Sequence, residues 1–312
     1  MALTSRISTH RGNEPFDPED LLYTSLGVIF PDDVTCQHGE AENSLVYASP
    51  HLPRPLVLDL AKPPSEDGRL FAHYLWNASL LLAELVEGDT LLRWRQREEE
   101  GGQWRNGKEE EPVGFDVGGL SVGELGAGTA LPSIMAGLVG ARRVLVTDYA
   151  SSAVLEALRT NTERNVRPEL APPGVVVPPP SEVLVRGHGW GGELPDDTPS
   201  HQHAYDRVFV CDCLWMPPQH GNLMRSVSML LKRGPSARAF IVAGFHTGRA
   251  GMAGFFDAEA LRRVGGLEVE RIWERDCDGV ERAWDPHAEE EDSTARKRWL
   301  VVAVLRRVEE ER

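Results

Sequence analysis

The residues best suited to hold a nucleoside lie between positions 122 and 148. Val122 to Pro132 reads V-G-E-L-G-A-G-T-A-L-P, in which Gly126 and Gly128 would let the backbone approach a ligand without interference from a Cβ atom. Asp148 follows 20 residues after Gly128, at the end of the next apolar run, where a carboxylate suits the hydroxyl groups of a ribose. This spacing predicts a nucleoside-binding site.

The rest of the motif limits the class of nucleoside ligand that would fit. A nicotinamide or flavin dinucleotide site would normally have a third glycine three residues after Gly128, and Leu131 stands there. Glu124, just before the glycines, would repel a pyrophosphate and suits a cationic amino-acid group. We therefore predict a nucleoside ligand with a cationic amino-acid part. The alternative is that the two glycines only form a structural turn.

The elements that must position these residues alternate between strand and helix. Short β-branched runs predict strands at 120–125, 143–147, 183–185, 208–210 and 239–243. Helical patterns accompany them at 70–83, 132–140, 152–165, 222–232 and 257–264. Such alternation is typical of a parallel sheet with helices on both faces, in which the first β/α junction is a ligand site. Two last strands, 267–273 and 298–305, are expected to form an antiparallel hairpin at the sheet edge.

Two motifs together resemble the S-adenosylmethionine site of the seven-strand methyltransferases: E-L-G-A-G-T-A-L-P and, after it, V-L-V-T-D-Y. The resemblance is closer to the lysine methyltransferases that modify non-histone proteins. Further motifs narrow the resemblance to a fungal branch of that family: G-H-G-W-G at 187–191, C-D-C-L-W-M-P at 211–217, A-G-F-H-T-G-R at 243–249 and K-R-W-L-V-V at 297–302. The resemblance covers about residues 70–307 and implies an α/β fold. That fold is the Rossmann-like, seven-strand class I methyltransferase, with a mostly parallel sheet and an antiparallel edge hairpin.

The resemblance also implies roles for individual residues. It assigns seven of them to the cofactor S-adenosyl-L-methionine, namely Trp76, Gly126, Ala127, Gly128, Asp148, Trp190 and Cys211. In this set the glycine turn faces the methionine, Asp148 holds the ribose and Trp190 lies against the adenine. Asp212 and Trp215, from the D-x-x-W motif, become the catalytic residues on the substrate side. The implied substrate and partner is translation elongation factor 1-alpha, methylated on its N-terminal glycine and the adjacent lysine.

Methyl transfer from a sulfonium needs an uncharged nucleophile. An α-amine, with a pKa of about 7.7–8.0, supplies one more readily than a lysine, with a pKa of about 10.4. A carboxylate raises the pKa of a nearby amine, so Asp212 is expected to orient N–H groups and not to remove a proton. Trp215 is expected to line the channel through which the substrate amine reaches the methyl group, and to stabilise a methylated ammonium by a cation–π contact.

Other interpretations stay open beside this one. The chain could be a small-molecule N-methyltransferase with a nicotinamide-like substrate, or a non-catalytic partner protein that binds the cofactor, although the retained acids and glycines argue against the latter. His188 and His246 could act as bases or as structural residues, and we place neither in the catalytic set. Cys211, Cys213 and His220 are too few ligands for a metal, so none is expected.

Two positions depart from the family pattern. Gly123 stands where a bulky apolar residue is usual, and Ala130 where glycine is frequent. The strand packing and the loop conformation could therefore differ slightly from those of the family, but no polar cofactor contact is lost.

The 312 residues are expected to form one domain with additions. Residues 1–54 predict a partly ordered N-terminal arm, and 55–308 the methyltransferase domain. Within that domain, the charge runs and glycines at 93–112 predict a mobile acidic insertion. The prolines at 167–181 favour an extended connection.

The net charge of −15 is unevenly placed. Four acidic runs near positions 98, 109, 289 and 309 hold 13 of the 48 acids, so the remaining body is close to neutral. Such a balance argues against a nucleic-acid partner. No apolar stretch reaches the roughly 18 residues that a membrane span needs, and the first residues carry no recognisable targeting signal, so a cytoplasmic location is expected. We also expect a monomer.

Overall fold

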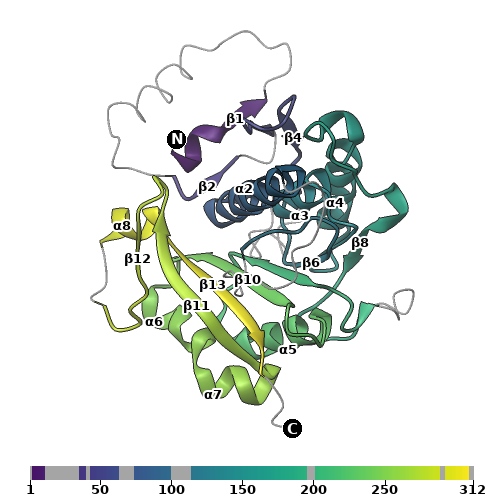
Figure 1. Cartoon of the computed structure of the whole chain (residues 1–312). Coiled ribbons are helices and arrows are strands. Elements are labelled where there is room, and N and C mark those ends of the chain that lie inside the picture. The colour runs from purple at the N-terminus through teal and green to yellow at the C-terminus, as the bar shows by residue number, and fades with distance from the viewer. Residues whose placement is uncertain are drawn as a thin grey trace.

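The computed structural model describes residues 2–10, 35–39, 43–62, 74–99, 114–194, 201–288 and 292–308. Over these ranges the middle layer is an eight-stranded sheet with the order β12-β11-β13-β10-β9-β6-β7-β8 (Figure 1). Five neighbouring strands run parallel: β6 (Ser121–Leu125), β7 (Arg143–Asp148), β8 (Val183–Gly187), β9 (Arg207–Cys211) and β10 (Arg238–Gly244). The antiparallel edge consists of β11 (Leu267–Asp276), β12 (Glu281–Ala283) and β13 (Trp299–Arg307).

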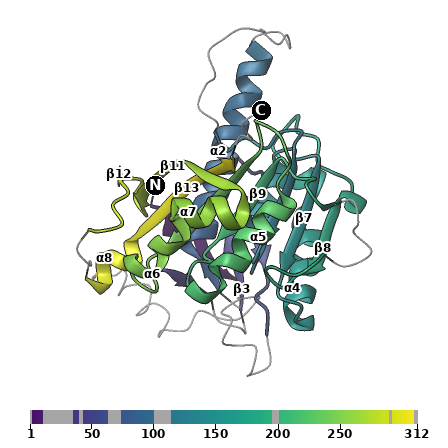
Figure 2. The same cartoon turned by 90° about the horizontal axis from the view of Figure 1, so that it is seen from below.

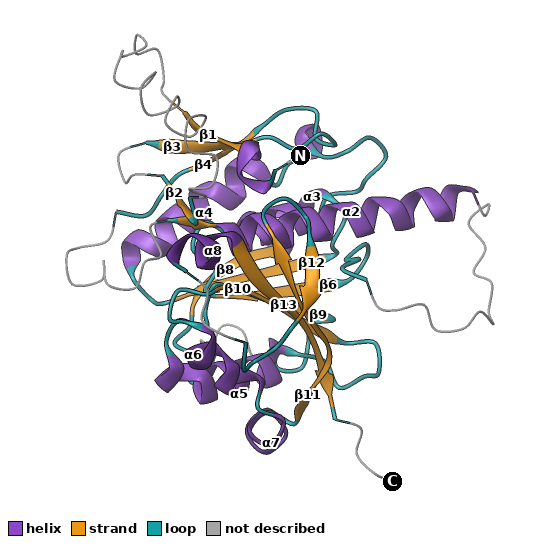
Figure 3. Cartoon of the chain, turned by 90° about the vertical axis from the view of Figure 1, so that its left-hand side faces the viewer, coloured by secondary structure: helices purple, strands orange, loops and turns teal. Residues whose placement is uncertain are grey.

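Helices cover both faces of this sheet (Figures 1 and 3). On one face lie α2 (Asn77–Glu99), α3 (Leu131–Leu138) and α4 (Ser152–Asn165), and on the other α5 (His220–Leu230), α6 (Arg249–Ala253) and α7 (Ala258–Ala260). The parallel strands feed both faces because successive side chains point to opposite sides. In β9, for example, Phe209 joins one hydrophobic cluster and Val208 and Val210 join the other. These strands are therefore buried on both sides, as continuous apolar runs predict.

The predicted fold class is confirmed, and α4 has the bounds expected from the sequence. The edge is more elaborate than a hairpin, because β12 pairs with the outer side of β11 and the short helix α8 (Ser293–Arg298) precedes β13. The helix expected at 257–264 is interrupted as well. A π-helical turn, Leu261–Gly265, follows α7 directly.

The expected boundary between residues 54 and 55 is wrong. β3 (Ser44–Tyr47) lies between β1 (Ile7–His10) and β4 (Leu56–Leu58) in one antiparallel sheet, so pairing crosses that boundary. Side chains of α4 fix this small sheet to the domain, since the amide groups of Asn165 and Asn161 bond the backbone of Val57 and Asp59. Short strands give too weak a period-2 pattern to be detected in the sequence.

The expected start of the acidic insertion at residue 93 is also wrong. α2 continues through Glu99, and Figure 2 shows its end reaching beyond the sheet. Residues 93–99 are good helix formers without a glycine or proline, so nothing ends the helix there. Trp94 secures this part because its Nε1–H donates to the Val139 carbonyl at 3.2 Å. Residues 100–113 lie outside the described part of the chain.

The N-terminus of α2 is held by a further pair of strands. β2 (Gln37–His38) pairs with β5 (Leu75–Trp76), and the helix begins directly afterwards at Asn77. The Asn77 amide donates to the Thr35 carbonyl at 2.9 Å, so the segment before β2 is fixed against the helix. Among the described residues no helix is long and apolar enough to cross a membrane.

Candidate active site

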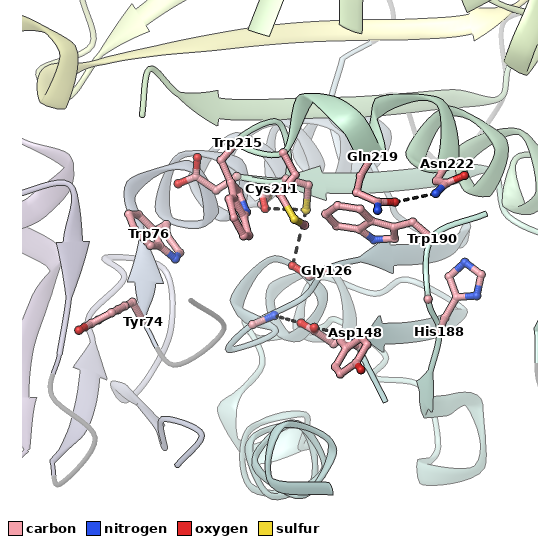
Figure 4. A pocket seen from close by; sticks show the side chains of 16 residues that line it. Tyr74, Trp76, Gly126, Asp148, His188, Trp190, Cys211, Trp215, Gln219 and Asn222 are labelled. Carbon is pink, nitrogen blue, oxygen red and sulfur yellow. Dashed lines mark hydrogen bonds between the residues drawn. The ribbon is translucent and has the colours of Figure 1, made fainter. Parts of the chain in front are cut away.

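A cavity of about 420 Å³ opens at the carboxyl ends of the parallel strands (Figure 4). Ligands of open α/β sheets bind at this edge. Eight of the nine predicted site residues line the cavity, namely Trp76, Gly126, Gly128, Asp148, Trp190, Cys211, Asp212 and Trp215. Residues spread over 140 positions of the chain are thus brought together because each follows or ends a strand of one sheet, or precedes α2.

Gly126 forms the floor of the cavity and must be glycine for two reasons. Its φ of +66° lies in the left-handed region, which side chains disfavour. A Cβ atom would also lie 2.6 Å from the Cys213 sulfur and 3.2 Å from Cζ2 of Trp190. The turn after β6 lines the cavity through Gly126, with Trp190 lying close above it (Figure 4).

Asp148 ends β7 beside this turn. Its Oδ2 accepts the N–H of Gly128 at 2.7 Å, and its Oδ1 accepts the N–H of Tyr149 at 2.6 Å. Burial raises the pKa of Asp148, while these two N–H groups act in the opposite direction. The carboxylate is thus held rigidly, and each oxygen retains a lone pair for a hydroxyl group in the cavity.

Asp212 follows β9 in a strained backbone conformation. Its φ of +54° is unusual for a residue other than glycine, and such outliers concentrate at functional sites. Its Oδ1 accepts the N–H of Gly244 at 2.9 Å, and Nε2 of His246 lies 3.0 Å from both carboxylate oxygens. Burial by itself would lower the pKa of His246, but Asp212 and the nearby Cys36 thiol raise it to about 10. His246 is therefore an imidazolium at neutral pH, paired with Asp212.

Aromatic rings surround this pair. The Trp76 ring meets the His246 ring edge-on at 4.7 Å between centroids, and Tyr74 meets Trp76 at 6.0 Å. Figure 4 shows Tyr74 and Trp76 at one side of the cavity, Trp190 at the other, and Trp215 between them. The cavity thus has an aromatic and acidic side around Asp212 and a glycine-rich side around Asp148.

A family model described as lysine methyltransferase matches residues 65–258. The chain belongs to this lysine methyltransferase family. With that, the resemblance noted in the sequence is confirmed, and the chain is an S-adenosylmethionine-dependent methyltransferase.

The relatives of this methyltransferase include several fungal proteins named Protein N-terminal and lysine N-methyltransferase EFM7. The Gibberella zeae protein is 28% identical over 235 residues, which cover 72% of this chain and 75% of that protein. The Eremothecium gossypii protein is 34% identical, over 57% of this chain and 56% of that protein. Among solved structures, an arsenic(III) S-adenosylmethionine methyltransferase from Chlamydomonas reinhardtii has a TM-score of 0.41 at 14% identity, with 72% of each chain covered. That last likeness is too low to bear on function.

The cavity of the methyltransferase fits S-adenosylmethionine. At Gly126 a Cβ atom would meet Cys213 and Trp190, so only glycine leaves the turn in this shape beside the cavity, and the fixed Asp148 carboxylate would supply an acceptor for ribose hydroxyls. The cofactor supplies a methyl group bound to a positively charged sulfur. Cys211 and Cys213 line the adjoining wall, and burial raises the pKa of both thiols well above the usual value, so they present neutral, polarisable sulfur.

Two expectations about the glycine motif need correction. Ala127 does not line the cavity, because between two glycines of positive φ its methyl group turns into the hydrophobic core. Glu124 is fully buried behind the turn, and its Oε2 accepts the N–H of Ser133 at 3.2 Å at the start of α3. Burial raises the pKa of Glu124 to about 8. Glu124 therefore supports the helix and does not line the cavity.

The two departures from the family pattern have structural counterparts. A Cβ atom at Gly123 would lie 3.2 Å from the Tyr205 ring, so this large side chain occupies the space that a bulky strand residue would need. Ala130 keeps the left-handed conformation, with a φ of 62°, that glycine adopts more easily. The loop conformation is thus retained despite the missing glycine.

Several cavity residues were missed by sequence reasoning. They are Tyr74, Tyr149, Gly189, Cys213, Met216, Gln219 and Asn222, together with His188, which the sequence offers as a possible base or a structural residue. Tyr149 directly follows Asp148, a neighbour relation that could have identified it. Gln219 precedes α5 and Asn222 lies within it. The Nδ2–H of Asn222 donates to Oε1 of Gln219 at 2.6 Å, and no spacing pattern in the sequence marks either residue. Across the described ranges, no group of three or more His, Cys, Asp or Glu side chains could hold a metal ion.

Proposed function

We propose that this methyltransferase modifies the N-terminal glycine and the adjacent lysine of translation elongation factor 1-alpha. The observation that carries the proposal is the Asp212 carboxylate, held by Gly244 and His246 at the aromatic side of the cavity. The names of the fungal relatives and the resemblance of the D-x-x-W motif at 212–215 support an amine of a protein chain as the target.

A protein N-terminus suits the chemistry of this side of the cavity. Near neutral pH an α-amine, with a pKa of about 7.7–8.0, is uncharged to a far larger extent than a lysine, with a pKa of about 10.4, so it becomes a nucleophile more readily. Asp212 would accept one N–H of the amine and direct its lone pair towards the donor, while Trp215 and Trp76 exclude water. The same rings would favour a methylated ammonium, which supports successive transfers to one nitrogen.

Replacing Asp212 by Asn tests this proposal. Asn tolerates positive φ, so the turn should persist while the negative charge is lost. We expect transfer of labelled methyl groups to purified elongation factor 1-alpha to fall by about 100-fold or more, because the amide oxygen is a weaker acceptor for the amine than a carboxylate and the pairing of both oxygens with His246 is broken. Affinity for S-adenosylhomocysteine, measured by calorimetry, should stay within about twofold, since Asp212 does not hold the glycine-rich side.

Asp257→Asn is the matched control. Asp257 caps α7 by accepting the N–H of Ala260 at 2.8 Å, a role that Asn also fills, and it does not line the cavity. This variant should keep full transfer. Robust methylation of nicotinamide by the wild-type protein, with none of elongation factor 1-alpha, would instead show a small-molecule enzyme.

A further inference from the structure

His246 occupies its position through a chain of specific contacts. Gly244, two residues earlier, leaves space for the imidazole ring, because a Cβ atom at Gly244 would lie 2.8 Å from Nε2 of His246. The ring is then placed between the Asp212 carboxylate, at 3.0 Å, and the Trp76 ring, at 4.7 Å. Only 25% of the His246 side chain is exposed.

The segment that carries His246 is anchored from its far end. Arg249 forms a buried ion pair with Glu274 of β11, and its guanidinium lies 4.6 Å from the centre of the Phe245 ring. Phe245 is itself buried, directly before His246. The loop 245–249 is thus held on both sides of His246, so the imidazole is presented to Asp212 by a fixed scaffold.

The charge of this pair matters for a bound amine. A lone carboxylate near an amine favours the ammonium form and raises the amine pKa by about 1–3 units, which removes the nucleophilic lone pair. An imidazolium at 3.0 Å from both oxygens of Asp212 cancels most of that charge. Within the described ranges, Asp212 from the end of β9 and Cys36 from the segment before β2 are the titratable groups that act on His246, and both raise its pKa.

We propose that His246 is a positioning residue that neutralises Asp212, so that Asp212 can orient the target amine without holding it as an ammonium. This inference rests on the proposed function, in which the target is an amine of a protein. Under it, the carboxylate orients the amine by accepting an N–H. The positive charge of His246 offsets the negative charge that would otherwise stabilise the protonated, non-nucleophilic form of the substrate amine.

The pH dependence of kcat at saturating elongation factor 1-alpha tests the inference, because kcat reports ionisations within the enzyme–substrate complex. In His246→Gln the acidic limb should move to higher pH by about one unit or more, with kcat approaching the wild-type value at alkaline pH. His246→Lys, which restores a positive charge, should return the limb towards its wild-type position. His287→Gln, which changes an exposed histidine, is the control and should leave the profile unchanged. A lower kcat at every pH with an unmoved limb would overturn the inference.

Nuclear magnetic resonance titration of the histidine ring protons gives a second readout that needs no substrate. The signal lost in His246→Gln identifies the residue among the ten histidines. Its pKa should lie well above 6.5 in the wild type and fall towards 6.5 in Asp212→Asn. Titration near 6.5 in the wild type would overturn the inference. If the wild type does not methylate elongation factor 1-alpha, the proposed function fails, and this titration alone decides whether His246 neutralises Asp212.

Discussion

At the scale of the residue, Asp148 combines two tasks that a substitution can separate. Asp148→Asn retains an acceptor for one backbone N–H but loses the charge that strengthens a hydrogen bond from a ribose hydroxyl. Hydrogen bonds to charged groups contribute about 1.5–3 kcal/mol, so affinity for S-adenosylhomocysteine should fall about tenfold or more. Calorimetric titration measures this, with Asp257→Asn as the variant that should bind normally. Unchanged affinity in Asp148→Asn would remove Asp148 from the cofactor site.

Gly126 offers a second test at the same scale. In Gly126→Ala, the added methyl group meets the Cys213 sulfur and Trp190, and the left-handed backbone costs a further ~1–2 kcal/mol. We expect weaker cofactor binding together with a lower melting temperature. A variant that binds S-adenosylhomocysteine with wild-type affinity would show that the glycine turn is not the floor of the cofactor site.

The contrast between Asp148 and His246 shows what spacing can reveal about single residues. Asp148 was predictable because a glycine turn and the end of the next strand lie a fixed distance apart in many nucleoside sites. The pairing of Asp212 with His246 depends on β9 and β10 lying side by side, and it joins residues 34 positions apart whose partner choice no local pattern encodes. Histidine in a loop has too many ordinary roles to be assigned from sequence alone.

At the scale of the element, α2 contains an exposed glycine that stability measurements can use. Nothing lies within 4 Å of a Cβ atom at Gly88, so Gly88→Ala should raise the free energy of unfolding by about 0.5–1 kcal/mol through better helix propensity. Gly137→Ala in α3 is the matched comparison, since its Cβ would lie 2.8 Å from a methyl group of Val166 and should destabilise. Equal effects of the two changes in urea unfolding would contradict this account of the helices.

Elements were predictable to different degrees for physical reasons. The parallel strands and α4 have strong periodic patterns, because each buries one face or both over its whole length. β3 and β4 are only four and three residues long, and their stability comes from α4 side chains that are distant in sequence. The end of α2 is hard to locate from the sequence because a run of charged residues is typical of mobile segments, although Arg, Gln and Glu are also compatible with a helix.

At the scale of the whole molecule, Glu124 makes stability depend on pH. Its pKa is about 8 in the folded protein, above the ordinary value of 4.5, so the folded state keeps a proton that the unfolded chain releases. The free energy of unfolding should therefore fall as the pH rises through this window. Glu124→Gln removes the cost of ionising a buried carboxyl group. Its free energy of unfolding should exceed that of the wild type by a few kcal/mol at pH 8 and by less at pH 5.

Urea unfolding at both pH values checks this, with Glu163→Gln on the exposed side of α4 as the control. The difference between Glu163→Gln and the wild type should be small and similar at the two pH values. A pH-independent difference for Glu124→Gln would mean that Glu124 is ionised in the folded state.

The proposed function requires that the molecule presents a free protein amine to the methyl donor. It is tested most directly by incubating the methyltransferase with S-adenosylmethionine and elongation factor 1-alpha whose N-terminus is either free or acetylated, and then locating the methyl groups by mass spectrometry. We predict methyl groups on the N-terminal glycine of the free form and none on the acetylated glycine, because an amide nitrogen is a poor nucleophile. An unmodified N-terminal glycine in the free form, under conditions where the enzyme binds S-adenosylhomocysteine, would contradict the account.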